Sequence, residues 1–343
     1  MNIDLLKQHI ASGLVREQSH PTLPLRILNY SASCQYDRAW DDVTLQCRGL
    51  VVHGNEIVAR PFRKFFNASE HAAGEIPWHL PNRVTEKLDG SLLIWFCFDG
   101  EWIAATRGSF TSEQARIGRE LILGNHSTFD FDESCTYLFE VIYPENRIVV
   151  NYGDRREVVL LAVVKTDTGD ERELDGDVFN VVRSVPATAS DAELRSIIRD
   201  DEEGYVVRFE NSFRVKIKGE RYCYLHKVIS GISSRMVWEN LSSGQSFAEL
   251  LEIIPDECGE WVRNQRDKLV DAYNGIETSA QFAVMDVAGM ATRKEQAARI
   301  LTRYRDISAV VFALLDGKDY AKPIWKMLYP KYERPQIVER IES

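Results

Sequence analysis

Long apolar stretches and export signals are both missing from this 343-residue sequence. No run of about 18 consecutive apolar residues occurs, which excludes an ordinary membrane-spanning helix. The opening residues M-N-I-D-L-L-K-Q-H-I are amphipathic and lack the apolar core and small-residue cleavage site of a signal peptide. These absences predict a soluble, cytoplasmic protein with no membrane partner.

The cysteines and histidines form no recognisable metal or disulfide pattern. None of the six cysteines belongs to a C-x-x-C pair, which argues against a zinc ribbon or a disulfide framework and for a reducing compartment. The seven histidines make no H-x-x-x-H or H-E-x-x-H pattern. Any bound metal is therefore expected to be held by oxygen atoms.

Net positive charge is also missing, since the formal net charge is -10. Taken alone this disfavours nucleic-acid binding, because phosphate contacts need clustered Lys and Arg. Residues 291–334 are an exception, with ten basic residues, five acidic residues and interleaved aromatic side chains. This segment carries a local positive field that could hold RNA by charge and by stacking on its aromatic rings, or it is only an ordinary solvated face. Trp325 within it is expected to be a core residue.

The first two thirds of the chain have the residue pattern of β-strands. Asp99-Gly100 and Asn211-Ser212 each predict a hairpin turn. Strand-forming runs rich in β-branched and aromatic residues occur at 136–143, 147–151, 157–164, 204–210 and 213–218. Helical patterns occur at 112–123 and 191–199 and dominate after about residue 224. We therefore predict an α+β fold with an antiparallel-sheet domain, residues 1–228, followed by an all-helical domain, residues 229–343.

Several charged residues lie in or beside apolar strands, where they need a partner. Lys87 in E-K-L-D-G-S precedes a buried strand, Glu140 lies inside one, and Glu203 begins another. Lys216 and Lys218 are two residues apart on a strand, so that they project from one face. Singly, each is better explained by a structural ion pair or by exposure to water. Together they indicate a site for an anion.

The order of these residues resembles a known superfamily. K-x-D-G at Lys87, F-E-V-I-Y at Glu140, E-E-G-Y-V-V-R at Glu203 and V-K-I-K at Lys216 and Lys218 are similar to four motifs of the covalent nucleotidyltransferases. The upstream segments C-R-G-L-V-V (47–52) and R-P-F-R-K-F-F-N (60–67) resemble the bacteriophage RNA ligase 1 type in particular. The similarity covers about residues 25–220 and implies an antiparallel-sheet nucleotidyltransferase (adenylyltransferase) domain.

The resemblance also implies a role for each matched residue. Lys87 would be the catalytic nucleophile, which attacks the α-phosphorus of ATP to give lysyl-AMP. The residues implied in ATP or AMP binding are Arg48, Lys64, Glu86, Leu88, Arg107, Glu140, Glu203, Lys216 and Lys218. Arg48 and Lys64 would hold the β and γ phosphates, and Glu140 the ribose hydroxyls. Glu203 is the residue expected to act on Mg²⁺ or Mn²⁺.

Two residues near the nucleophile have open alternatives. Asp89 either orients Lys87 or forms the turn. Arg107 either meets a phosphate or the RNA end, or forms a structural salt bridge. The pKa of Lys87 is expected to fall, because burial and the neighbouring cations disfavour the ammonium form.

The activity implied by the resemblance is ATP-dependent RNA ligation in RNA repair. A 5′-phosphate and a 3′-hydroxyl of single-stranded RNA or of broken transfer RNA would be joined. The oligomeric state is open, with a monomer favoured. The alternatives are a DNA ligase, a GTP-using capping enzyme, or a catalytically silent nucleotide- or RNA-binding module. Capping enzymes and large DNA ligases usually append a β-barrel where this chain turns helical, which favours RNA ligase.

Overall fold

The computed structural model describes residues 1–125, 129–174, 179–254 and 256–335. The chain divides into two compact units, Met1–Tyr224 and a second that begins at Leu225. The predicted domain border, after residue 228, lies inside helix α6, Glu220–Gly231. No helix in this described part of the chain is long and apolar enough to cross a membrane.

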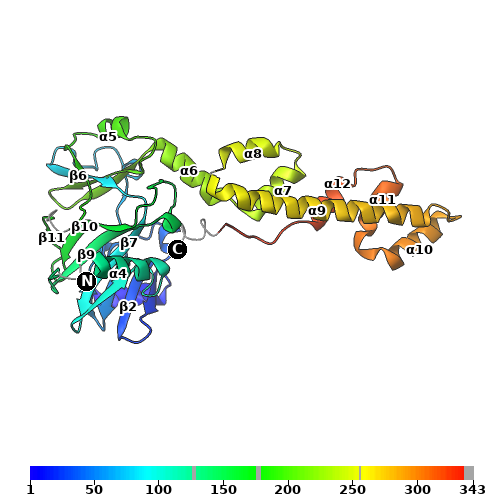
Figure 1. Ribbon diagram of the computed structural model, residues 1–343. Helices are drawn as coiled ribbons and strands as arrows, with labels where there is room; N and C mark the ends of the chain where they lie inside the picture. Colours follow the sequence, from blue (N-terminus) through cyan, green and yellow to red (C-terminus); the bar gives the residue numbers. More distant parts are fainter. Residues whose placement is uncertain (126–128, 175–178, 255, 336–343) are drawn as a thin grey trace. The chain divides into compact units, whose positions relative to one another are not determined.

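The first unit is built on three sheets (Figure 1). The first has the order β1 (Val15–Ser19), β2 (Leu25–Tyr30), β3 (Arg48–His53) and β4 (Glu56–Ala59). The second has the order β11 (Glu171–Arg172), β10 (Glu157–Lys165), β9 (Cys135–Ile142), β7 (Ser91–Phe98) and β8 (Glu101–Ala105). The third has the order β12 (Ser184–Val185), β6 (Asn82–Lys87), β13 (Gly204–Phe209), β14 (Arg214–Lys218) and β5 (Phe66–Asn67). Except for the parallel pair of β14 and β5, the named strands pair antiparallel across the described residues.

Short helices cover these sheets. The α-helices of this unit are α1 (Ile3–Ala11), α2 (Ala32–Tyr36), α3 (Asp42–Gln46), α4 (Glu113–Asn125), α5 (Asp191–Ile197) and the start of α6. Two 3-10 turns, Ala68–Glu70 and Pro144–Asn146, join the strands. The two predicted helical patterns at 112–123 and 191–199 correspond to α4 and α5.

Strand β7 is apolar from Leu92 onward because both of its faces pack against other elements. Leu93 and Trp95 pack with α4 and β9, whereas Ile94 and Phe96 pack against the first sheet. The hairpin to β8 is closed by Asp99 and Gly100, both at positive φ, as the Asp-Gly pair predicts. This rigid strand begins four residues after Lys87 and fixes the turn between them.

The third sheet has one apolar and one charged face. Val84, Val207, Val215 and Ile217 belong to one buried cluster on the apolar face. The residues that alternate with them are mostly charged or polar, and they include Lys87, Lys216 and Lys218. This sheet therefore presents a row of cations on one side.

The second unit is helical (Figure 1). It contains α7 (Ser234–Ser242), α8 (Phe247–Ile253), α9 (Asp256–Val287), α10 (Arg293–Arg303), the 3-10 turn Arg305–Ile307, α11 (Ser308–Leu315) and α12 (Ala321–Met327). Its core joins the end of α9 to the next helices through buried aliphatic side chains such as Val287, Ile300 and Val311. The predicted fold class, antiparallel sheets followed by helices, is confirmed.

One predicted strand is wrong. Residues 147–151 form a loop, although the sequence R-I-V-V-N favours β structure. The backbone N–H groups of Val149 and Val150 donate to the carboxylate of Asp89, at 2.7 and 2.8 Å, instead of to a neighbouring strand. A buried side chain thus replaces the β ladder, which periodicity alone does not reveal.

Candidate active site

The three central strands of the third sheet bring Lys87, Gly204 and Lys218 into one row. Gly204 on β13 is opposite Lys87 on β6 and also opposite Lys218 on β14. Gly204 has φ +142°, and a Cβ there would lie 2.0 Å from the carbonyl oxygen of Ile217. Only glycine fits this position, and its lack of a side chain leaves room between the two lysines.

Glu203, at the start of β13, bridges these two lysines. Lys87 Nζ donates to Glu203 Oε2 at 2.7 Å, and Lys218 Nζ lies 2.9 Å from Glu203 Oε1. The Glu203 side chain is only 2% exposed, while each lysine side chain is about a quarter exposed. Burial would raise the pKa of Glu203, but the two ammonium groups outweigh it and lower that pKa.

The expected fall in the pKa of Lys87 is wrong for this state of the protein. Burial does act to lower it, but the Glu203 carboxylate and the charge of Glu140 outweigh burial and raise the pKa of Lys87. The sequence indicated the cations near Lys87, but it could not show that the Glu203 carboxylate contacts the Lys87 amine. The direction of the pKa shift was therefore predicted wrongly. Lys87 is therefore held as an ammonium while this pair is intact.

Glu140 faces the turn between β6 and β7. Its Oε1 accepts a hydrogen bond from the Gly90 N–H at 3.0 Å, and a Cβ on Gly90 would lie 2.6 Å from the Val141 carbonyl oxygen. Burial is the main reason that the pKa of Glu140 rises to about 7, and the negative charge of Glu203 adds to it. Glu140 can thus gain or lose a proton near neutral pH.

Asp89 acts as an anchor for the surrounding loops. Besides the two loop N–H groups already described, its Oδ1 accepts from Tyr222 of α6 at 2.9 Å. Its own N–H donates to Tyr152 at 2.9 Å. Across the described residues, the hydrogen bonds of Asp89 go to these loop and helix groups and not to Lys87. They support a structural role at the turn over direct orientation of the nucleophile.

Lys216 and Arg48 add positive charge near the lysine row, and Arg48 also hydrogen-bonds to Tyr30. No hydrogen bond or ion pair of the Lys216 ammonium is found within the described residues, and Arg48 Nη1 is buried without a hydrogen-bond partner. Burial first, and then Lys64 and the other cations, lower the pKa of Lys216 to about 7. Burial and the charge of Arg107 likewise lower the pKa of Arg48. Cations held in this way are suited to an anionic ligand.

Tyr30 links two more of the predicted phosphate-binding residues. Its hydroxyl lies 3.5 Å from both Lys64 Nζ and Arg107 Nη1. The Lys64 ammonium also lies 5.2, 5.5 and 5.3 Å from the ring centres of Tyr30, Trp40 and Phe66. Arg107 was expected either to meet a phosphate or the RNA end or to form a structural salt bridge. No such salt bridge is found in the described part of the chain.

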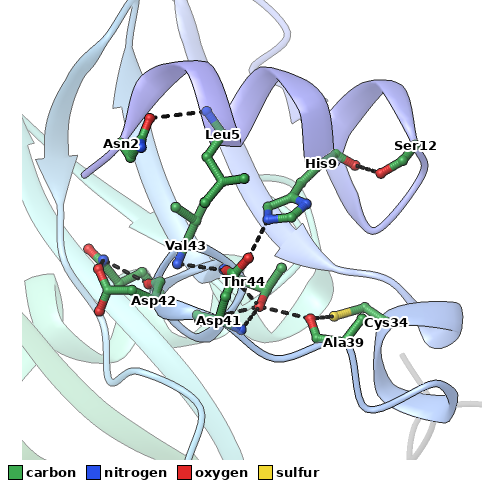
Figure 2. Close-up of polar contacts among 11 residues, drawn as sticks. Asn2, Leu5, His9, Ser12, Cys34, Ala39, Asp41, Asp42, Val43 and Thr44 are labelled. Carbon is green, nitrogen blue, oxygen red and sulfur yellow. Dashed lines mark hydrogen bonds and ion pairs between the residues drawn. The ribbon is translucent and has the colours of Figure 1, made fainter.

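The segment that carries Trp40 is fixed by a polar cluster (Figure 2). Asp41 Oδ1 caps α3 by accepting the N–H groups of Val43 and Thr44, at 2.9 and 2.8 Å. Its Oδ2 lies 2.6 Å from His9 Nε2 of α1. This cluster holds the segment next to Trp40, one of the aromatic residues around the Lys64 ammonium. The sequence analysis missed the cluster because α1, Tyr30 and Trp40 belong to separate segments.

A cavity of about 390 Å³ lies beside the lysine row. Its lining includes Lys87, Glu140, Arg48 and Leu88, and its size is in the range of small-ligand sites. Glu86 also lines it, with its carboxylate paired to Arg183 Nε at 3.0 Å. Lys64 instead lines a neighbouring cavity of about 720 Å³. Both contain Phe62, Phe65, Glu171 and Arg214 in their linings.

The carboxylates near Lys87 fit one divalent cation held jointly with a ligand. No group of three His, Cys, Asp or Glu suited to a metal occurs within the described ranges. Magnesium needs only one or two carboxylates where phosphates and water complete its coordination. Glu140 and Glu203 supply such carboxylate oxygens beside Lys87, and the pKa of Glu140 is raised chiefly by burial and further by the charge of Glu203.

The antiparallel sheets and this cluster of lysines and carboxylates agree with the class that the sequence motifs resemble, the covalent nucleotidyltransferases. Within that class, a sequence model of the RNA ligase family, of the T4 RNA ligase 1 type, matches residues 46–222, more than half of the chain. The chain belongs to this family. The predicted resemblance to RNA ligases of the bacteriophage RNA ligase 1 type is confirmed. The predicted enzyme class, RNA ligase, is confirmed as the class of the family.

Similar proteins carry related names. The RNA ligase of Rhodothermus phage RM378 is 23% identical over 93% of this chain and 90% of its own length. A protein of Autographa californica nuclear polyhedrosis virus, provisionally named as a bifunctional polynucleotide kinase/RNA ligase, is 26% identical over 82% of this chain. The match spans only 44% of that viral protein.

Among solved structures, an archaeal ATP-dependent RNA ligase is similar over 92% of this chain and 96% of its own. The sequence identity is 16% and the TM-score 0.45.

Proposed function

We propose that this protein joins a 5′-phosphate to a 3′-hydroxyl of RNA with ATP, through lysyl-AMP and an adenylylated RNA end. The observation that carries the proposal is the Lys87–Glu203–Lys218 bridge beside Lys216 and the buried Arg48, within the part of the chain that matches the RNA ligase family. Single-stranded RNA, including broken transfer RNA, is the proposed substrate, and RNA repair the proposed process.

In the first step the Lys87 amine forms a bond to the α-phosphorus of ATP. The bond from that phosphorus to the bridging oxygen breaks, and pyrophosphate leaves. Because Glu203 holds Lys87 as an ammonium in the free protein, the pair must first open and the ammonium must lose its proton. Nucleotide binding is the event that supplies new partners for both groups.

The cations of the site stabilise charge on the phosphates. Lys216 and Lys218 neutralise the α-phosphate oxygens, and Arg48 and Lys64 orient the pyrophosphate as it leaves. Glu140 accepts hydrogen bonds from the ribose hydroxyls, and Glu86 and Leu88 line the base side of the cavity. Arg107 contacts a phosphate of ATP or of the RNA end.

Glu203, together with phosphate oxygens, would hold the divalent cation, Mg²⁺ or Mn²⁺, which supplies positive charge where pyrophosphate departs. Every other contribution to the reaction comes from the side chains of the protein itself.

The later two steps use the same cations. The 5′-phosphate of RNA takes AMP from Lys87, and the 3′-hydroxyl of the second RNA end then attacks that phosphate and displaces AMP. Both are phosphoryl-type transfers, so that one site serves the whole reaction.

The proposal is tested by incubating the protein with α-labelled ATP, or α-labelled GTP, and Mg²⁺, followed by a denaturing gel. We expect label from ATP alone on the wild type, and none on Lys87→Ala. The matched control is Lys165→Ala, which removes an exposed lysine at the end of β10 and should keep the label. Label from GTP instead would indicate a capping-type enzyme.

The substrate is tested by offering 5′-phosphorylated single-stranded RNA or nicked duplex DNA. Joined or circular RNA is the expected product. Efficient sealing of the nicked DNA alone would overturn the proposal in favour of a DNA ligase, and absence of any lysyl adenylate would favour a silent binding module.

A further inference from the structure

The helical unit contains a hollow lined by aromatic and basic side chains. Its volume is about 330 Å³, and its lining residues are Trp238, Ser242, Lys322, Trp325, Lys326 and Tyr329. Among the described residues that line it, none is acidic. In a chain of net charge -10 this is a distinctly basic place.

The aromatic side chains are held in place by contacts with one another and with Tyr273. Trp238 Nε1 donates to the Trp325 carbonyl oxygen at 2.8 Å, and the Trp238 and Tyr329 rings meet edge to face with centres 5.0 Å apart. Trp325 is braced by Tyr273, at 5.0 Å between ring centres. These contacts preorganise ring faces, which lowers the entropy lost when a flat ligand stacks on them.

The rings are not part of the hydrophobic core of the unit. That core is formed by aliphatic residues such as Ala283, Val287 and Ile324, and its described members do not include Trp238 or Trp325. The expected core position of Trp325 is therefore wrong, since its side chain is half-buried and lines the hollow. Tyr329 is 52% exposed.

Positive charge surrounds the rings. Lys322 and Lys326 are exposed, and within the described ranges neither makes an ion pair. The Arg235 guanidinium lies 5.2 Å from the ring centres of both Tyr329 and Tyr332. Stackable rings flanked by free cations are the features that bind single-stranded nucleic acid with little sequence preference.

We propose that this hollow binds the single-stranded RNA substrate, with a base stacked on the Trp325 and Tyr329 rings and the backbone phosphates on Lys322 and Lys326. The proposal rests on the RNA ligase function proposed above and adds a site outside the segment that matches the family. A negatively charged, flat and flexible polymer is the ligand that complements this surface.

The experiment measures binding of a fluorescein-labelled, 5′-phosphorylated single-stranded RNA of about 12 nucleotides to the full chain by anisotropy. Tyr329→Ala should weaken binding about tenfold, whereas Tyr329→Phe, which keeps the ring, should bind like the wild type. Because Tyr329 is exposed, its replacement should leave the unit folded, and self-adenylylation with labelled ATP checks that the catalytic unit is intact.

The charge is tested with the double variant Lys322→Ala/Lys326→Ala. Its matched control is Lys268→Ala/Lys294→Ala, which removes the same charge from two exposed lysines elsewhere in the unit. We expect the first pair to lower the slope of log affinity against log salt by about 1.4, at about 0.7 per phosphate contact, and the control to leave it unchanged.

Equal RNA affinity for Tyr329→Ala and Tyr329→Phe, or equal effects of the two lysine pairs, would overturn the inference while self-adenylylation remained normal. A chain that fails to form lysyl-AMP at all would instead refute the proposed function. A surface that serves another protein would leave RNA affinity unchanged in every variant, and this too would overturn the inference.

Discussion

At the residue scale, two lysines of one sheet have opposite pKa shifts. Lys87 touches the Glu203 carboxylate, which raises its pKa, whereas partial burial and then the neighbouring cations lower the pKa of Lys216 to about 7. The difference is decided by which charges lie nearest, because burial disfavours the ammonium form of both. The free protein is therefore arranged to hold the nucleophile protonated and to keep one cation ready for an anion.

The shift of Lys216 predicts a break in the pH profile of self-adenylylation. Between about pH 6 and 9, kcat/KM for ATP should rise with pH as more of Lys87 loses its proton, and the rise should flatten above about pH 7. The flattening follows because a pKa lowered to about 7 means that Lys216 loses its charge above that pH. In Lys216→Arg the side chain stays charged, so the rise should continue to the upper end of the range.

Glu140 also titrates near pH 7 and provides the control, since its pKa is raised to about 7. Glu140→Gln should slow the reaction but keep the break, because Lys216 is unchanged. A profile that loses its break in Glu140→Gln and keeps it in Lys216→Arg would show that the carboxyl, and not the lysine, sets the profile.

The identities of the charged site residues could be predicted from sequence, but their contacts could not. Alternation placed Lys216 and Lys218 on one face, and the motif order pointed to Lys87, Glu140 and Glu203. The Glu203 bridge and the Tyr30 contacts depend on distances across separate strands, which no local pattern encodes.

At the element scale, turn chemistry was a better guide than strand propensity. Asp99-Gly100 closes the β7–β8 hairpin, and Ser212 at φ 65° lies in the turn between β13 and β14. Residues 147–151 have equally good strand propensity, yet they form a loop because Asp89 takes their N–H groups. Propensity is a weak guide when a buried side chain competes for backbone donors.

Gly204 is the backbone position on which the pairing of the lysine-bearing strands depends. Gly204→Ala should lower the free energy of unfolding by at least about 2 kcal/mol, because the added Cβ would meet the Ile217 carbonyl at a strained φ. Urea unfolding gives the stability, and labelled ATP the activity, which should be lost.

The matched control is Gly153→Ala. Gly153 also has a positive φ, +65°, but a Cβ there has no atom within 4 Å. Gly153→Ala should lower the free energy of unfolding by about 1 kcal/mol, from backbone strain alone, and should retain self-adenylylation. Equal losses in the two variants would mean that close approach at Gly204 contributes nothing.

At the scale of the whole molecule, two sites among the described residues carry local positive charge in an acidic chain. One is the partly buried lysine row of the first unit, and the other is the exposed basic hollow of the helical unit. Net charge alone pointed away from nucleic acid, whereas the local distribution pointed toward it. The sequence predicted the two fold types in order, but whether aromatic residues of the helical part faced a core or a surface required the structure.

This distribution predicts a different salt dependence for the separate steps. Raising KCl from about 50 to about 200 mM should increase KM for RNA by about sevenfold, if two phosphate contacts lie on the exposed surface. The rate of self-adenylylation should change by less than about twofold, because partly buried charges are screened less. Steady-state ligation measures KM for RNA, and single-turnover labelling measures the rate of self-adenylylation. Equal changes in both would contradict the prediction that salt acts mainly on RNA binding.

The most direct test of the account is the position of the adenylate. After incubation with ATP and Mg²⁺, tandem mass spectrometry of a digest prepared at neutral or alkaline pH should find AMP bonded to Lys87 and to no other residue. AMP on a different side chain, or RNA joining without any adenylate on Lys87, would contradict the assignment of this lysine as the nucleophile.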